Sequence, residues 1–376
     1  MPLKRLHIVI IGGGYGGTTL VHALRNMPNV YVTLIDQRTH HMVQTEIHRY
    51  LGGEADEEEI LFELASFAQK NGAKFVCDKV ALIDNENKVV TCHKGTIISY
   101  DLLVVATGSV SLFPKQIQNI DAYAKDVKTL EDLQGFKQAF DALIESKPHN
   151  ECIAIVGGGL TGTEIALEYA ARLKRLGLSK EACRVVLIEQ QPTLLPGSNE
   201  TLINEAKAAC ESLDVACYHG AFVTKLEDNV IHLSDGTIIP FHTVLLTIGV
   251  TSKPLAFKQP VPLSPRGQII VNQSLHVNDN LSLFAIGDVA YCEDKEGKMI
   301  LPTAQNAKQQ AKSVAKNIKH ILQGKPLNRY TFQNRGVLVD LAEKKATGNA
   351  FGFSFNGIKA YTLKRTVNSI HTKIFK

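Results

Sequence analysis

The stretch "IVIIGGGYGGTT", residues 8–19, decides the fold of this 376-residue chain. Its four leading apolar residues predict a buried strand, and the glycine run predicts a tight turn into a helix. A second apolar run, residues 30–35, ends in Asp36. The glycines keep the spacing G-x-G-x-x-G, at Gly12, Gly14 and Gly17. A strand, a glycine turn, a helix and a strand ending in an acid predict a dinucleotide-binding unit of the Rossmann type.

Each residue of this unit has a distinct physical role. Gly12 permits the tight turn, Gly14 lets the backbone approach a pyrophosphate, and Gly17 lets the helix pack close to the strand. The pyrophosphate would lie at the positive end of the helix dipole. Asp36 would accept hydrogen bonds from ribose hydroxyls.

The same arrangement occurs a second time in the chain. The apolar run 153–156 leads into another glycine turn, and the apolar run 185–188 ends in Glu189. The glycines of this turn are Gly157, Gly159 and Gly162. Two such units predict two dinucleotides, FAD as a prosthetic group and NADH as the one that exchanges. Gln190 and Gln191 follow Glu189 without an Arg for a 2′-phosphate, which favours NADH over NADPH.

Two other strand ends predict contacts to a cofactor. The apolar runs 102–105 and 244–248 end in small residues, which let backbone lie against a ligand: Ala106, Thr107, Gly108 and Gly249. Asp288 follows the apolar run 283–286. Because a buried carboxylate without a partner is costly, we expect Asp288 to accept hydrogen bonds from the ribityl hydroxyls of FAD. An Asp that only caps a loop is the alternative.

A long helix is expected directly after this region. Thr303 is a suitable N-cap for a helix that begins at Ala304. The positive end of that helix would face the flavin and stabilise the negative charge of its reduced form. One face of the helix is basic and the other is apolar at helical spacing.

Composition places the chain among globular proteins. It is 44% hydrophobic and 21% charged, and its length suggests two or three domains. We find no apolar run near the roughly 20 residues that span a bilayer and no signal-peptide pattern, so we expect a cytoplasmic protein. The cysteines show no closely spaced pair, which predicts reduced thiols and no metal site: Cys77, Cys92, Cys152, Cys183, Cys210, Cys217 and Cys292.

The charge is unevenly distributed. The net charge is +4, but from Lys312 onward 13 Lys/Arg stand against two acids, a net +11. The first 311 residues therefore carry −7. A basic end on an acidic body indicates an anionic partner, such as a membrane surface, a nucleic acid or an acidic protein. A solvated basic face is the alternative.

Four stretches carry a resemblance to one family. They are "HHMVQTEIHRYLGG" (40–53), "GGGLTGTEIALE" (157–168), "LPTAQNAKQQ" (301–310) and "GVLVDLAEKKATG" (336–348). With the two glycine turns, they resemble the type II NADH dehydrogenases, the single-subunit NADH:quinone oxidoreductases. This family belongs to the flavoprotein reductases with two dinucleotide-binding domains. The similarity extends over nearly the whole chain.

The resemblance implies a set of site residues. Those implied to hold FAD are Gly12, Gly14, Tyr15, Gly16, Gly17, Asp36, Val80, Ala106, Thr107, Gly108, Asp288 and Ala304. Those implied to hold NADH are Gly157, Gly159, Gly162, Glu189 and Gly249. It also implies proton handling by Glu164, a quinone site at Gln305 and Gln309, and a lysine near that site, Lys345. An acid at a helix N-terminus, a packed helix face and a solvent-facing lysine are the competing interpretations.

The sequence also departs from the family pattern. Ala342 and Glu343 replace the family's Gly-Arg before Lys345, and the family's aromatic C-terminal anchor has no counterpart here. The last residues still mix apolar side chains with basic ones, including Lys364, Arg365 and His371. Such a segment is expected to lie on an anionic membrane, to pack on the body, or to form a homodimer interface.

The expected architecture is α/β, with two Rossmann-like domains, the second inserted in the first, and a small C-terminal cap. The FAD domain is expected over 1–125 and 263–325, the NADH domain over 126–262, and the basic cap over 326–376. The expected activity is hydride transfer from NADH to FAD and electron transfer on to a membrane quinone, without proton pumping. The enzyme would lie peripherally on the inner face of the cell membrane.

Three alternatives remain. A sulfide:quinone reductase would need a cysteine pair beside the flavin, for which Cys152 and Cys183 are the candidates. A soluble ferredoxin- or rubredoxin-type reductase would use the basic end to dock an acidic carrier. A non-enzymatic NADH sensor is the third, although no nucleic-acid partner is expected because the end lacks interleaved aromatic residues. A disulfide reductase is disfavoured because no dithiol follows Asp36.

Overall fold

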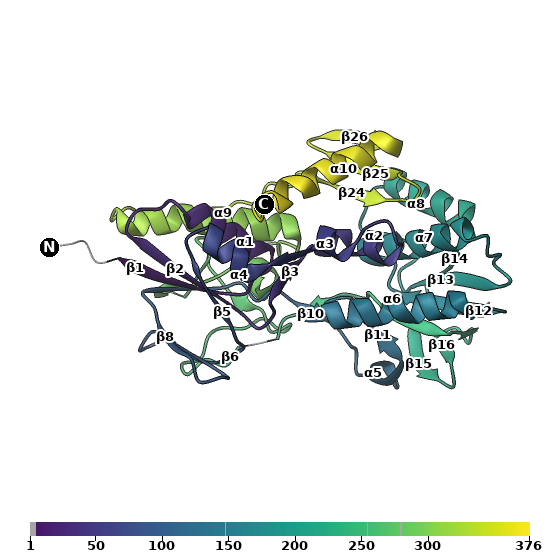
Figure 1. Ribbon diagram of the computed structural model, residues 1–376, viewed down its shortest axis with the longest axis horizontal. Coiled ribbons are helices and arrows are strands. Elements are labelled where there is room, and N and C mark those ends of the chain that lie inside the picture. The colour runs from purple at the N-terminus through teal and green to yellow at the C-terminus, as the bar shows by residue number, and fades with distance from the viewer. Residues whose placement is uncertain (1–4, 147, 254, 279) are drawn as a thin grey trace.

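The computed structural model describes residues 5–146, 148–253, 255–278 and 280–376 (Figure 1). Its first unit is built on a six-stranded sheet in the order β21-β22-β9-β1-β2-β5. All neighbours are parallel except β21 and β22. The strands are β1 (Leu6–Ile11), β2 (Val30–Asp36), β5 (Lys74–Cys77), β9 (Leu102–Val105), β21 (His276–Val277) and β22 (Asn280–Ala285).

The second unit repeats this plan with a parallel sheet in the order β11-β18-β12-β13-β14. Its strands are β11 (Ala124–Lys125), β12 (Glu151–Val156), β13 (Cys183–Glu189), β14 (Ala216–His219) and β18 (Thr243–Leu246). The order β18-β12-β13-β14 matches β9-β1-β2-β5 of the first unit. The expected α/β class with two Rossmann-like units is therefore confirmed.

Each unit also carries an antiparallel three-stranded meander between the third and fourth matching strands. The first is β6 (Val80–Asp84), β7 (Val89–Cys92) and β8 (Ile97–Ser99); the second is β15 (Val223–Glu227), β16 (Val230–Leu233) and β17 (Ile238–Pro240). The remaining short strands are β3 (His40–Met42), β4 (Leu61–Glu63), β10 (Val110–Ser111), β19 (Val250–Thr251), β20 (Ile269–Ile270) and β23 (Ala290–Tyr291).

Helices cover the parallel sheets. In the first unit α1 (Tyr15–Leu24) and α9 (Ala304–Leu322) pack side by side (Figure 1). Other helices are α2 (Ile47–Leu51), α3 (Glu57–Ile60), α4 (Leu64–Lys70), α5 (Ile120–Tyr123), α6 (Leu130–Glu145), α7 (Leu160–Arg175) and α8 (Glu200–Ser212), with single 3₁₀ turns η1 (Gln44–Glu46) and η2 (Gly287–Val289). The strands are Val/Ile/Leu-rich because both faces of a parallel sheet are covered. The apolar face of α9 is buried as expected, at Ala307, Ala311, Val314, Ala315 and Ile318.

The two crossings between the units contain short paired strands. β11 pairs with β18 of the second sheet, and β10 and β19 pair with each other. Two-residue strands carry too little hydrophobic periodicity to be read from the sequence. The division into an FAD and an NADH domain remains a proposal.

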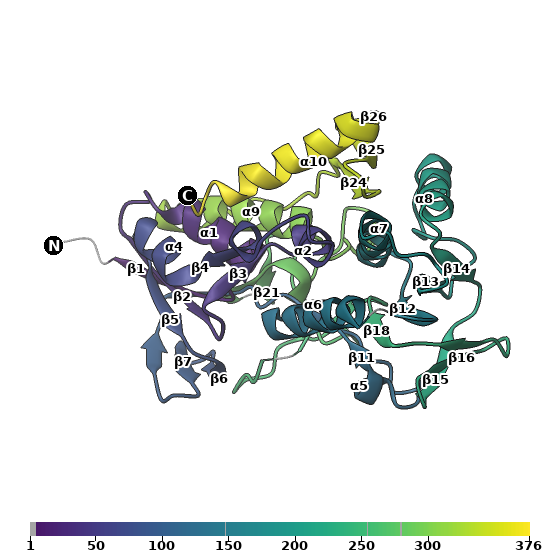
Figure 2. The same cartoon turned by 45° about the vertical axis from the view of Figure 1, so that its right-hand side comes forward.

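The C-terminal cap consists of β24 (Gly336–Asp340), β25 (Ala346–Ala350), β26 (Phe353–Asn356) and α10 (Gly357–Thr372). Figure 2 shows α10 running from its own small sheet, above the second unit, to α9 of the first. The residues after α10 pack on the first unit, because Phe375 lies against the rings of Phe62 in β4 and Phe67 in α4. Among the described residues, no helix combines the length and the apolar composition that crossing a bilayer requires.

Candidate active site

In the first glycine turn the first and last glycines are tightly packed, whereas the middle one of the motif has free space beside it. Gly12 has φ +111°, and a Cβ there would collide with the Ala106 carbonyl. A Cβ on Gly17 would collide with the Gly12 carbonyl, whereas one on Gly14 would meet no atom within 4 Å. The backbone at Gly14 is thus accessible at the N-terminus of α1, as a pyrophosphate requires.

The second turn has the same construction. Gly157 has φ +113°, and a Cβ there would lie 2.6 Å from the Thr247 carbonyl. A Cβ on Gly162 would collide with the Gly157 carbonyl, and one on Gly159 would meet nothing within 4 Å. Both turns therefore fit a dinucleotide, and the fit rests on their geometry as well as on their spacing.

The two acids also make equivalent contacts. Asp36 accepts the backbone N–H of Gly13 on Oδ2 (2.5 Å) and that of Arg38 on Oδ1 (2.8 Å). Glu189 accepts the N–H of Gly158 on Oε2 (2.7 Å) and that of Gln191 on Oε1 (2.8 Å). Burial raises the pKa of Asp36, although these N–H groups counteract it. Each acid thus fixes its glycine turn and keeps lone pairs for ribose hydroxyls. The middle glycines, Gly13 and Gly158, were not singled out by the sequence reasoning.

Asp288, which we expected to accept hydrogen bonds from the ribityl hydroxyls of FAD, also has a partner within the protein. It is half-buried in η2, and its Oδ2 accepts a hydrogen bond from Ser109 Oγ (2.7 Å). Lys128 Nζ donates to the same Ser109 hydroxyl (3.4 Å), and burial lowers the pKa of Lys128. Gln310 of α9 accepts the Gly287 N–H (2.6 Å) and so fixes the turn before Asp288.

The other expected FAD and NADH contacts are distributed as follows. Ala106, Thr107 and Gly108 follow β9 directly, and a Cβ on Gly108 or on Gly249 would meet nothing within 4 Å. Thr303 caps α9 as expected, because its side chain accepts the Asn306 N–H, and Ala304 is the first residue of that helix. Tyr15 and Gly16 open α1. Val80 is 8% exposed and belongs to the core of the first unit.

Gln305 and Gln309 hold the segment that leads to the cap. Gln305 accepts the Arg335 N–H (2.8 Å) and donates to the Gly336 carbonyl (3.2 Å). Gln309 accepts the Gln333 N–H (2.9 Å) and donates to the Gln333 carbonyl (2.8 Å). Both amides thus bind backbone, a role that the sequence reasoning did not consider. Their contact with a quinone remains a proposal.

This arrangement predicts a stability effect for Gln305→Ala. The substitution leaves the Arg335 N–H and the Gly336 carbonyl without their partner, so we expect the free energy of unfolding to fall by about 1–2 kcal/mol. Denaturant unfolding measures this loss, and Gln323→Ala, an exposed glutamine at the end of the same helix, is the control. Unchanged stability together with a higher KM for quinone would show that the amide serves the quinone instead.

Glu164, one turn into α7, lies in a buried ionic cluster. Glu164 is only 8% exposed, and Lys364 Nζ of α10 donates a hydrogen bond to its Oε1. The Asp340 N–H donates to the same oxygen (2.9 Å), and His48 Nδ1 lies 3.5 Å from the other. The cluster therefore joins α2, α7 and the cap around the Glu164 carboxylate.

Asp340 is the second acid of the cluster. His48 Nε2 lies 2.5 Å and Lys364 Nζ 3.2 Å from its Oδ2, and Arg365 donates to the same oxygen. Burial would raise the pKa of Asp340, but Lys364, the His48 hydrogen bond and Arg365 outweigh burial and hold the pKa well below its usual value. Glu164, Asp340 and His48 are also a possible metal-ligand set, but the Lys364 ammonium occupies the place of a cation between the carboxylates.

Lys345, which the resemblance places near the quinone site, lies on the surface of the cap, and its contact with a quinone remains a proposal. Lys345 is 63% exposed and lies 3.6 Å from Glu343, in the turn between β24 and β25. Glu343 contacts Lys174 (3.4 Å), ten residues along α7 from Glu164, which is about 15 Å. The lysine that the fold brings to Glu164 is Lys364. Lys364 and His371 are 8% and 6% exposed, so of the alternatives left open for the last residues these two side chains follow packing on the body.

A neutral histidine pair ties the end of the chain to the first glycine turn. His41 Nδ1 donates to the Gly13 carbonyl (2.9 Å), so its Nε2 accepts, and His371 Nε2 donates to it (3.3 Å). Burial lowers the pKa of His41 to about 4 and that of His371 further, and Lys308 adds to both effects. Phe375 stacks on His41 with ring centroids 4.9 Å apart.

This pair predicts a loss of stability in mild acid. The folded pKa values lie below the ordinary 6.5, so the unfolded chain binds protons first and stability falls as the pH drops below about 6.5. We expect the free energy of unfolding to fall by up to about 1.4 kcal/mol per pH unit for each histidine. His371→Phe removes one of the two histidines. Between about pH 6.5 and 5.5 it should therefore remove roughly half of the pair's contribution to the slope of unfolding free energy against pH. His93→Phe, at an exposed histidine, should leave it unchanged; equal slopes in all three proteins would contradict the assignment.

The fold and the two glycine turns define a class of protein, the reductases that hold two dinucleotides in two Rossmann-like units. The chain belongs to the pyridine nucleotide-disulphide oxidoreductase family, whose sequence profile matches residues 6–311. The type II NADH:quinone oxidoreductase of Staphylococcus aureus (strain NCTC 8325 / PS 47) is 29% identical over 98% of this chain and 96% of its own. That of Staphylococcus haemolyticus (strain JCSC1435) gives the same values.

Solved structures show the same fold. NDH2 from Plasmodium falciparum, in complex with NADH, has a TM-score of 0.87 at 18% identity and covers 99% of this chain and 97% of its own. A sulfide:quinone oxidoreductase from Aquifex aeolicus has a TM-score of 0.82 at 20% identity, with coverage of 97% and 90%. The expected similarity to type II NADH:quinone oxidoreductases is confirmed, and the family agrees with an enzyme that uses FAD and NADH.

Proposed function

We propose that this protein oxidises NADH and reduces a membrane quinone, with FAD as the carrier between them. The observation that supports it most strongly is the duplication: each unit presents one open glycine turn, fixed by one acid through the middle glycine. Similarity to type II NADH:quinone oxidoreductases over 98% of the chain agrees with this assignment.

In this proposal each unit holds one dinucleotide. Gly14, Asp36 and Asp288 hold FAD, while Gly159 and Glu189 hold NADH. When bound, FAD supplies the ability to accept hydride and to pass two electrons on. Glu189 accepts N–H groups from Gly158 and Gln191 and would repel a 2′-phosphate, which favours NADH.

The buried cluster would handle protons beside the second glycine turn. Lys364 donates a hydrogen bond to Glu164, and the Glu164 and Asp340 carboxylates raise the pKa of Lys364 against the opposing effect of burial. One turn further along α7, burial raises the pKa of Glu168 to about 7, so this side chain can hold or release a proton near neutral pH.

The membrane contact is proposed for the outer face of the cap. Large apolar side chains are exposed there, and exposed lysines accompany them: Phe351 (61%), Phe353 (69%), Ile358 (68%) and Ile370 (61%), with Lys359 and Lys373. Apolar anchors among basic residues suit an anionic lipid surface. The protein would thus lie peripherally on the cytoplasmic face of the cell membrane; a homodimer through the same face is the alternative.

The placement of the cysteines disfavours sulfide as the reductant. Cys152 is the second residue of β12 and Cys183 the first of β13, and five residues of strand, about 16 Å, separate Cys152 from Gly157. Burial raises the pKa of Cys183 to about 12 and that of Cys152 above its usual value, so neither is a reactive thiolate.

An acceptor panel with the FAD-loaded protein tests the proposal. We expect NADH oxidation to be fast with a short-chain quinone and slow with a ferredoxin or a rubredoxin. Co-sedimentation with anionic vesicles should fall on Ile358→Ser/Ile370→Ser, while Ile97→Ser, at an exposed isoleucine of the first meander, should leave it intact. Preference for a carrier protein over quinone would refute the proposed acceptor.

A further inference from the structure

A long acid-free segment surrounds α9. Residues 297–339 contain eight Lys/Arg and neither Asp nor Glu. Three of these lysines lie together near the C-terminal end of the helix, at positions 316, 319 and 325. In the described part of the chain no carboxylate lies within 4.0 Å of any of the three. The three ammonium groups are therefore free of close ion pairs with the described residues.

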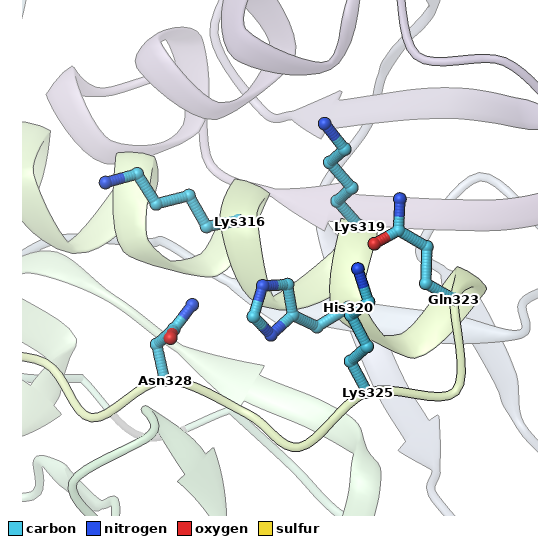
Figure 3. Close-up of a pocket in the computed structure, with 6 residues that line it drawn as sticks. All are labelled: Lys316, Lys319, His320, Gln323, Lys325 and Asn328. Carbon is cyan, nitrogen blue, oxygen red and sulfur yellow. The ribbon is translucent and has the colours of Figure 1, made fainter.

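These lysines border a cavity of about 360 Å³ between α9 and the segment after it. Figure 3 shows the His320 ring at its centre, with Lys316 and Lys319 extending from the helix and Lys325 and Asn328 from the facing segment. Every lining residue is basic or neutral: Lys316, Lys319, His320, Gln323, Lys325 and Asn328. Such a lining attracts anions and repels none.

The walls of the cavity are fixed by buried hydrogen bonds. Asn317, which is fully buried, donates to the Asn328 carbonyl (3.1 Å) and accepts the Asn328 N–H (2.8 Å). His320 Nδ1 donates to the Pro326 carbonyl (2.6 Å), which fixes the orientation of the ring between the helix and the facing segment. The facing segment is thus held against the helix, and a ligand does not need to order it.

Charge decides the kind of ligand. The C-terminus of a helix carries roughly −0.5 of a charge, which disfavours anions. The three lysines that line the cavity carry six times that charge with the opposite sign, so its lining favours an anion. A phosphate group carries up to two negative charges and several acceptor oxygens, which suit several ammonium donors at once.

We propose that this cavity binds a phosphate group, carried by a soluble phosphate compound or by the headgroup of an anionic lipid. The site is separate from the glycine turns, because the 16 residues from Ala304 to His320 span about 24 Å of helix. The inference stands independently of the electron acceptor and of the cap surface described above.

The test compares two triple variants of the full-length, FAD-loaded protein. Lys316→Gln/Lys319→Gln/Lys325→Gln removes the charge of the cavity. Lys70→Gln/Lys115→Gln/Lys298→Gln removes the same charge from exposed lysines elsewhere and is the control. Calorimetry with inorganic pyrophosphate measures soluble binding, and co-sedimentation with phosphatidylglycerol vesicles measures lipid binding. Flavin content and the thermal midpoint verify folding.

We expect the cavity variant to lose at least tenfold in affinity and the control to match the wild type. Loss of pyrophosphate binding with unchanged vesicle binding would identify a soluble ligand. If pyrophosphate binds none of the proteins and only the cavity variant loses vesicle binding, the ligand is a lipid headgroup. If the two variants behave alike in both assays, whether both retain binding or both lose it, the cavity is not a phosphate site.

Discussion

Gly17→Ala is expected to yield a protein that folds poorly and retains no flavin. The added Cβ would collide with the Gly12 carbonyl, a backbone atom that cannot move without opening the glycine turn. We expect the free energy of unfolding to fall by about 3 kcal/mol or more. Gly162→Ala should cause comparable damage in the second unit, because its Cβ would collide with the Gly157 carbonyl.

Gly14→Ala and Gly159→Ala are the matched variants, because they add the same methyl group where nothing lies within 4 Å. Both residues have ordinary φ values, −75° and −72°, so the fold should be unaffected. The methyl group would instead occupy the space of a pyrophosphate. We expect Gly14→Ala to weaken flavin binding at least tenfold, and Gly159→Ala to keep flavin but raise the KM for NADH at least tenfold.

Flavin release, denaturant unfolding and steady-state kinetics measure these effects separately. If Gly14→Ala retained flavin as the wild type does, the first glycine turn would not hold the pyrophosphate. If Gly159→Ala had the KM of the wild type for NADH, the second glycine turn would not hold NADH.

Lys364→Met is the second substitution with a large expected effect. It removes a cation from between the buried Glu164 and Asp340 carboxylates, and breaking such a pair costs about 3–5 kcal/mol. Lys345→Met removes an exposed lysine of the same cap, and its effect should stay within about 0.5 kcal/mol. Denaturant unfolding of the two variants measures the difference directly.

A double-mutant cycle separates the pair from general damage to the cap. If Lys364 acts through Glu164, the variant Lys364→Met/Glu164→Gln should be more stable than the sum of the single effects predicts, by about 1 kcal/mol or more. The pH dependence of quinone reduction should also change in Lys364→Met, because this substitution removes the ammonium group that contacts the Glu164 and Asp340 carboxylates. Strict additivity together with an unchanged pH profile would refute this role.

The parts of the fold predicted from the sequence were those with a local signal. The runs 8–11 and 153–156 are apolar, and each is followed by glycines whose spacing has one structural solution. Thr303 was recognisable as an N-cap because the capping hydrogen bond spans only three residues. The duplication could therefore be predicted before any contact was known.

The parts that could not be predicted depend on distant partners. Lys364 and Glu164 are 200 residues apart, and a lysine in an amphipathic basic helix has the sequence signature of a surface residue. Ser109, which donates to Asp288, is 179 residues away from it. The short strands β10 and β19, which mark the crossings between the units, pair only with each other. Tertiary packing determines each of these contacts.

The most direct test of the central claim is anaerobic stopped-flow absorbance of the flavin with NADH and then with a short-chain quinone. We predict that NADH bleaches the flavin absorbance and that quinone restores it, each within the turnover time. Rapid bleaching by sulfide in place of NADH, or a protein that takes up no flavin, would contradict the claim.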